Sequence, residues 1–153
     1  MKRTILMMAV LGLVAVQADR IWAHCEVPCG IYADQRRFEQ MLEDQTTIAK
    51  AATSIQDLAG DHDPQSLNQL VRWINTKEQH ATTVQHTIAQ YFMTQRIQPG
   101  AEGSAKKLAA AHAVMVAAMK SKQSADPAVA NDLRAKILDF YRAYEGKEPN
   151  LEG

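Results

Sequence analysis

Apolar residues recur at helical spacing in four stretches of the chain, residues 34–60, 63–95, 104–120 and 126–146. Within each stretch they fall three or four positions apart, so they share one face of a helix. Period-two alternation, which is typical of strands, is absent. The pattern predicts an all-α protein folded as an antiparallel four-helix bundle. The residues expected to face inward are Phe38, Met41, Leu42, Ile48, Ala49, Ala52, Ile55, Leu58, Leu67, Leu70, Val71, Ile74, Ala81, Val84, Ile88, Tyr91, Phe92, Leu108, Ala111, Met115, Ala118, Met119, Val129, Leu133, Ile137, Phe140, Tyr141 and Tyr144.

Capping residues mark the ends of these helices. Asp63-Pro64 and Asp126-Pro127 each combine an N-cap residue with a proline at the first helical position, which is the strongest start signal in the chain. We expect the other two helices to be capped by Asp34 and Ser104, and the first and fourth helices to be closed by Gly60 and Gly146. Residues 121–125 read as a polar linker.

The first 23 residues resemble a targeting segment. A basic start at Lys2 and Arg3 is followed by an apolar run over residues 5–16 and by Ile21-Trp22-Ala23. We expect cleavage after Ala23, with a cut after Ala18 or a retained membrane anchor as the alternatives. The interpretation divides the chain into a leader (residues 1–23), an N-terminal hook (24–32), a helical bundle (33–146) and a C-terminal tail (147–153). It predicts an exported bacterial protein, periplasmic or secreted, with no stable membrane association after cleavage.

Charge argues against some classes of partner. The whole chain has 17 basic and 17 acidic residues, and the leader removes three of the first and one of the second, which leaves a formal charge of −2. Nucleic-acid binding needs a concentrated basic face, so this balance gives no reason to expect it. The 130 residues that remain suit one domain.

The candidate chemistry lies in the nine residues that follow the expected cut, His24-Cys25-Glu26-Val27-Pro28-Cys29-Gly30-Ile31-Tyr32, which include both cysteines. Cleavage frees the α-amine of His24, whose pKa of about 7.7–8 lets it donate a lone pair near neutral pH. With the His24 imidazole, the Cys25 backbone nitrogen and the thiolates of Cys25 and Cys29, it forms a nitrogen–sulfur donor set. Such a planar set suits nickel(II) or copper(II) better than zinc, which prefers a tetrahedron.

At these residues the chain resembles the nickel superoxide dismutases, whose mature proteins begin His-Cys-x-x-Pro-Cys-Gly-x-Tyr. The resemblance implies a nickel ion held by His24, Cys25 and Cys29, with Tyr32 beside the open coordination position. It implies conversion of superoxide to dioxygen and hydrogen peroxide by cycling between Ni(II) and Ni(III), an antioxidant activity. It also implies a small four-helix bundle that assembles as a homohexamer.

The resemblance extends to two residues expected to support the His24 ring. Arg37-Phe38-Glu39 is similar to the family's Arg-x-Glu, if one residue after Tyr32 is taken as deleted, which indicates Glu39. Lys77-Glu78-Gln79-His80 stands where the family has Lys-Glu-Gln-Arg, so His80 replaces an arginine. The alternative is that Glu39 is simply a surface carboxylate and His80 simply a partly exposed histidine.

Two other functions are consistent with the same residues. A carrier for copper or nickel would use the same hook without consuming superoxide. An exported interaction domain would instead pair Cys25 with Cys29 in a disulfide, which leaves His24, Pro28 and Tyr32 unexplained. The remaining histidines, His62, His86 and His112, have no spacing that indicates shared ligation.

Overall fold

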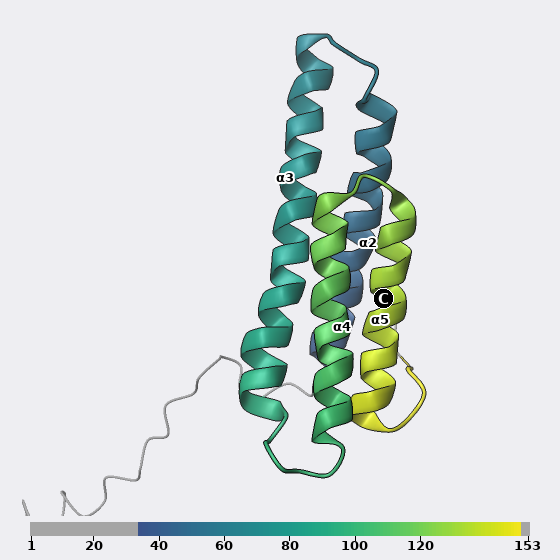
Figure 1. Cartoon of the computed structure of the whole chain (residues 1–153). Coiled ribbons are helices and arrows are strands. Elements are labelled where there is room, and N and C mark those ends of the chain that lie inside the picture. The colour runs from purple at the N-terminus through teal and green to yellow at the C-terminus, as the bar shows by residue number, and fades with distance from the viewer. Residues whose placement is uncertain (1–33, 151–153) are drawn as a thin grey trace, which may run out of the picture.

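The computed structural model describes residues 34–150, and these form four antiparallel helical rods (Figure 1). The elements are α2 (Gln35–Leu58), α3 (Pro64–His86), the π-helix η1 (Thr87–Arg96), α4 (Ser104–Gln123) and α5 (Pro127–Glu145). Because η1 continues α3 without a break, the two make one rod. No strand occurs among the described residues, so the predicted all-α bundle is confirmed for them. The hook lies outside the described residues.

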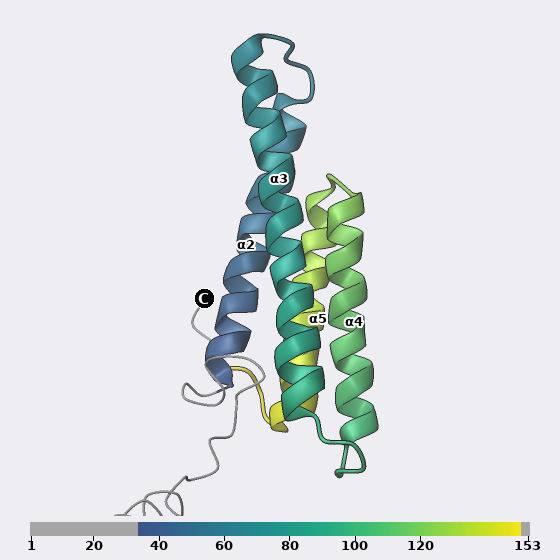
Figure 2. The ribbon, with the colours of Figure 1, turned by 90° about the vertical axis from the view of Figure 1, so that its left-hand side faces the viewer.

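The rods are arranged in a ring in which α2 packs against α3 and α5, and α4 packs against α3 and α5 (Figure 2). The hairpin of α2 and α3 extends well past the turn that joins α4 to α5 (Figure 1). The prediction that Leu67, Val71 and Ile74 face inward is therefore wrong. Their exposed fractions are 44%, 57% and 39%, because no second pair of helices covers this part of α3. The prediction is also wrong for Leu108 and Met119 on α4, whose exposed fractions are 36% and 41%.

The caps agree with the sequence where proline follows aspartate. The Asp63 carboxylate accepts hydrogen bonds from the backbone N–H groups of Gln65 and Ser66, and that of Asp126 accepts one from Ala128. Gly146 closes α5 with φ of +72°, and its N–H donates to the Arg142 carbonyl, as predicted.

Three predicted boundaries are wrong. Ser104 is the first residue of α4 and not its cap, because Gly103 turns the chain before it with φ of +70°. Helix α2 ends at Leu58 with Ala59 as its C-cap, so Gly60 lies beyond the end. Helix α4 continues to Gln123 through the first part of the predicted linker.

Aromatic rings fill the core at the end of the bundle where α2 begins. Phe38 is the centre of this cluster, with ring centroids 4.9 Å from Phe92, 5.0 Å from Tyr141 and 5.2 Å from Phe140. Phe38 is fully buried and contributes contacts to η1 and α5 together. Tilted and edge-on ring pairs of this kind stabilise a core beyond their buried area. The cluster therefore holds the start of α2 against η1 and α5.

Lys77 is buried, which is unusual for lysine, with 4% of its surface exposed. Its ammonium donates hydrogen bonds to the backbone carbonyls of Ser121 (2.7 Å) and Lys122 (2.5 Å) in the last turn of α4. These carbonyls have no partner within the helix. Lys77 thus caps α4 from α3.

Among residues 34–150, none of the helices combines the length and the apolar character needed to cross a membrane.

Candidate functional site

The four hook residues with predicted roles, His24, Cys25, Cys29 and Tyr32, lie outside the described residues. Within residues 34–150 no group of three or more histidine, cysteine, aspartate or glutamate side chains is placed to hold a metal ion. Both cysteines precede residue 34. The described residues nearest to the hook in the sequence are those at the start of α2.

Asp34, the residue at that point, accepts hydrogen bonds from three side chains. The Tyr91 hydroxyl donates to its Oδ1 at 2.5 Å, and the Tyr144 hydroxyl donates to its Oδ2 at 2.7 Å. The Arg96 guanidinium donates to Oδ2 through Nη2 (2.8 Å) and Nε (3.1 Å). The carboxylate thus joins the start of α2 to η1 and to the end of α5. We call these four residues the Asp34 cluster.

The pKa values in the cluster follow from this geometry. Burial would raise the pKa of Asp34, but the hydrogen bonds from Tyr91, Arg96 and Tyr144 outweigh burial, so the pKa lies below its ordinary value. Burial and the adjacent carboxylate raise the pKa of Tyr91 to about 12 and also raise the pKa of Tyr144. At neutral pH the carboxylate is therefore charged and both tyrosines are donors.

The π-helix explains how Tyr91 and Arg96 reach the same carboxylate. In an α-helix, residues five positions apart lie about 140° apart around the axis. A π-helix closes its hydrogen bonds five residues along, so such residues lie on the same side of the helix. The backbone N–H of Ile97 donates to the Phe92 carbonyl at 2.9 Å in this pattern. Sequence periodicity gave no sign of η1.

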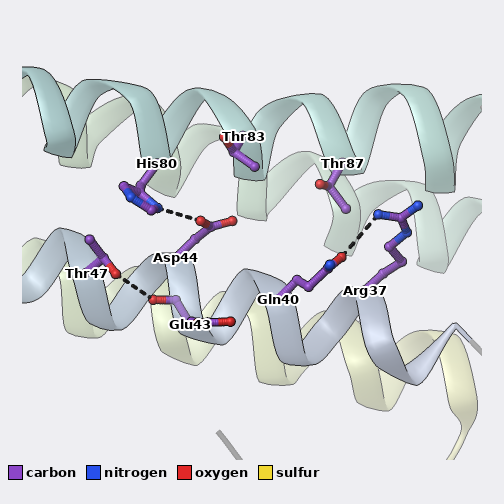
Figure 3. Close-up of a pocket in the computed structure, with 8 residues that line it drawn as sticks. All are labelled: Arg37, Gln40, Glu43, Asp44, Thr47, His80, Thr83 and Thr87. Carbon is purple, nitrogen blue, oxygen red and sulfur yellow. Dashed lines mark hydrogen bonds and ion pairs between the residues drawn. The ribbon is translucent and has the colours of Figure 1, made fainter.

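A groove of about 380 Å³ lies between α2 and α3, close to the same end of α2 (Figure 3). His80 projects into it from α3, and its Nδ1 lies 2.6 Å from Oδ1 of Asp44 on α2. Burial raises the pKa of Asp44, and the hydrogen bond with His80 acts in the opposite direction. The groove is lined by Arg37, Gln40, Glu43, Asp44, Thr47, His80, Thr83 and Thr87.

Arg37 occupies the end of this groove nearest the start of α2 (Figure 3). Its Nη1 donates to Oε1 of Gln40 at 3.1 Å, and its guanidinium carbon lies 4.9 Å from the centre of the Tyr91 ring. Its Nη2 is buried without a hydrogen-bond partner in the described residues. Buried polar groups nearly always have a partner. Arg37 therefore has one N–H group that no described residue accepts.

Glu39 and His80, the two predicted supports of the His24 ring, have different partners. Glu39 accepts a hydrogen bond from Gln35 (3.0 Å) and forms an ion pair with Arg36 (3.5 Å). It does not line the groove into which His80 projects. The described residues thus show no contact between the two, and His80 is paired with Asp44 instead. His62, His86 and His112 are exposed.

The comparison with protein families identifies the chain. The model for nickel-containing superoxide dismutase matches residues 19–148, which is most of the chain. The chain belongs to the nickel-containing superoxide dismutase family. It is therefore an oxidoreductase that acts on superoxide with a nickel cofactor, as the sequence predicted. The comparisons with curated proteins and with solved structures gave no match.

The matched region of this superoxide dismutase includes the hook and the helices α2 to α5. Family membership favours the dismutase function over the two alternatives, a metal carrier and a disulfide-stapled interaction domain. Sequence reasoning missed the contacts of Asp34 and Asp44 with other helices. Asp34 and Asp44 act across helices, so their partners depend on helix register and rotation, which periodicity alone does not give.

Proposed function

We propose that the enzyme holds nickel at its mature N-terminus, through the amine and imidazole of His24, the backbone nitrogen and thiolate of Cys25, and the thiolate of Cys29. The chemistry of this donor set carries the proposal. Anionic sulfur and amide-nitrogen donors stabilise a higher metal oxidation state, which the aqueous ion does not reach under mild conditions. The described helices provide no rival cluster, and the family match begins five residues before His24.

When bound, nickel supplies a one-electron couple between Ni(II) and Ni(III). Two superoxide radicals and two protons then give one dioxygen and one hydrogen peroxide. Tyr32 is assigned to the open face, where its hydroxyl orders substrate or water. Pro28 restricts the loop between the thiolates, and Gly30 allows the chain to turn away after Cys29.

Glu39 and His80 are assigned to the support of the His24 ring, as the family resemblance implies. His24 lies ten positions before Asp34, and an extended chain of that length spans about 33 Å. Glu39 lies little more than one helical turn beyond Asp34, and Asp44, the partner of His80, lies about 15 Å along α2. Both assignments are within reach of the hook.

The leader is proposed to direct export, and its removal after Ala23 frees the amine on which ligation depends. We also propose that the enzyme assembles as a homohexamer. Leu67, Val71 and Ile74 support self-association, because they form an exposed apolar stripe at helical spacing on α3.

Serine substitutions at Cys25 and Cys29 test the assignment. Serine is a poor ligand for nickel, so each variant should lose its nickel and its superoxide dismutation and keep its helical circular dichroism. Met119→Ser, an exposed change on α4, is the matched control and should keep nickel and activity. Full activity in either cysteine variant would refute the ligand assignment. Nickel binding by the wild-type protein without consumption of superoxide would favour the carrier.

A further inference from the structure

Asp34 occupies the N-cap position of α2 but does not cap it. Its backbone is helical, with φ of −55° and ψ of −26°, and its side chain makes no cap hydrogen bond. Asp63 and Asp126, in the same position on α3 and α5, have extended backbones and do cap. The local hydrogen bond that an aspartate makes here has been replaced by contacts with distant elements.

The side-chain contacts of Asp34 are strong hydrogen bonds. A carboxylate that accepts from a guanidinium and two hydroxyls forms charge-assisted hydrogen bonds, which are shorter and stronger than neutral ones. The Asp34 side chain is only 10% exposed, so water competes weakly for it. The Tyr91 and Tyr144 rings also belong to the aromatic core, where each lies 5.2 Å from Phe92. Asp34 is thereby attached to the buried aromatic core of the bundle.

Asp34 is close in the sequence to the hook residues Tyr32 and Cys29. Tyr32 is two residues away and Cys29 five, so their Cα atoms lie within about 7 Å and 18 Å of the Asp34 Cα along an extended chain. Fixing Asp34 limits the volume that the base of the hook can occupy. Ordering a segment before it binds reduces the entropy lost on binding.

We propose that the Asp34 cluster is a positioning device for the nickel hook. In this role, Tyr91, Arg96 and Tyr144 hold the Asp34 carboxylate and thereby place Tyr32 and Cys29 relative to the bundle. None of the four residues is assigned to nickel or to superoxide. The inference rests on the proposed assignment of nickel to the hook.

The test is the dissociation constant for nickel, measured by competition with a chelator on the mature protein. Asp34→Asn keeps the shape of the side chain but removes the charge and one acceptor oxygen. We expect it to bind nickel about 10–100-fold more weakly, the range for residues that orient metal ligands. Asp126→Asn is the matched control, because it alters an N-cap carboxylate at the opposite end of the bundle, and its nickel affinity should stay within twofold of wild type.

A second pair of variants covers the case in which Asp34→Asn does not fold. Tyr144→Phe removes one donor to Asp34, whereas Tyr141→Phe alters a buried tyrosine on the same helix that does not donate to it. The first should weaken nickel binding severalfold and alter the thiolate-to-nickel absorption bands, and the second should do neither. A purely structural role would lower the thermal midpoint without changing either measurement.

The outcomes separate the two proposals. The positioning role is wrong if Asp34→Asn, or Tyr144→Phe where Asp34→Asn does not fold, binds nickel within twofold of its control. If Cys25→Ser abolishes nickel binding in the same experiment, the assignment of nickel to the hook is still supported. If Cys25→Ser binds nickel as the wild type does, the ligand assignment is wrong and the positioning role falls with it.

Discussion

Lys77→Met is the sharpest test of how the bundle is held together away from the metal. Methionine has nearly the same length as lysine and keeps the apolar stem in place, but it cannot donate. The change leaves the carbonyls of Ser121 and Lys122 without the donor they now have at 2.7 and 2.5 Å. The ion pair of Lys77 with Glu78 is longer, at 3.6 Å, and contributes little because the Glu78 side chain is 44% exposed.

The magnitude follows from those two hydrogen bonds. Hydrogen bonds from a charged donor contribute about 1.5–3 kcal/mol each, and an acceptor left unsatisfied in a buried place costs about 1–3 kcal/mol. Part of this loss of stability is offset, because the variant no longer has to desolvate a buried ammonium group when it folds. We therefore expect the free energy of unfolding to fall by about 2–4 kcal/mol.

The assay is urea denaturation at neutral pH, followed by far-ultraviolet circular dichroism. Lys106→Met, an exposed lysine on α4, is the matched control and should change the free energy of unfolding by less than about 0.5 kcal/mol. Nickel content should be the same in both variants, because Lys77 caps the end of α4 remote from Asp34. A Lys77→Met protein as stable as the control would refute the role of Lys77 as a cap.

Three further predictions concern the same bundle. Phe38→Ala should destabilise the protein by about 3–5 kcal/mol in the same assay, because Phe38 is fully buried at the centre of the aromatic cluster. Asp126→Ala should cost about 1 kcal/mol through loss of the α5 cap, again by urea denaturation. The thermal midpoint of wild type should exceed that of Asp34→Asn most at neutral pH, and the gap should close on acidification. The folded pKa of Asp34 lies below the ordinary 3.8, so its stabilisation is complete above that value and is lost as the pH falls through the folded pKa. A gap independent of pH between 7 and 2 would contradict this.

The parts of the fold that could be predicted are those set by local physics. Asp63-Pro64 and Asp126-Pro127 carry their signal within four residues, and both cap as expected. Asp34 has the same side chain, but its partners Tyr91, Arg96 and Tyr144 lie 57, 62 and 110 residues away. No local pattern reveals such partners.

Helical periodicity identifies an apolar face but not what covers it. Leu67, Val71 and Ile74 continue the stripe of α3, and they are exposed only because α4 and α5 end before reaching them. Periodicity also fails at η1, where the turn widens.

The candidate site also has a part that could be predicted from local sequence and a part that could not. Nine consecutive residues from His24 to Tyr32 were enough to predict a nickel superoxide dismutase, and the family match confirms that function. The partners of Glu39 follow from helical spacing, because Gln35 and Arg36 lie four and three residues before it on α2. The partner of His80 was not predictable from spacing, because its contact with Asp44 depends on how α2 and α3 are rotated against each other. The roles of both toward His24 stay predictions.

Native intact-mass analysis of the protein purified after export tests the central claim most directly. The proposal predicts one species that begins at His24, with a free amine, and carries one nickel ion per chain. A nickel-loaded chain that retains its leader, with His24 in a peptide bond, or a mature chain that carries zinc would contradict it.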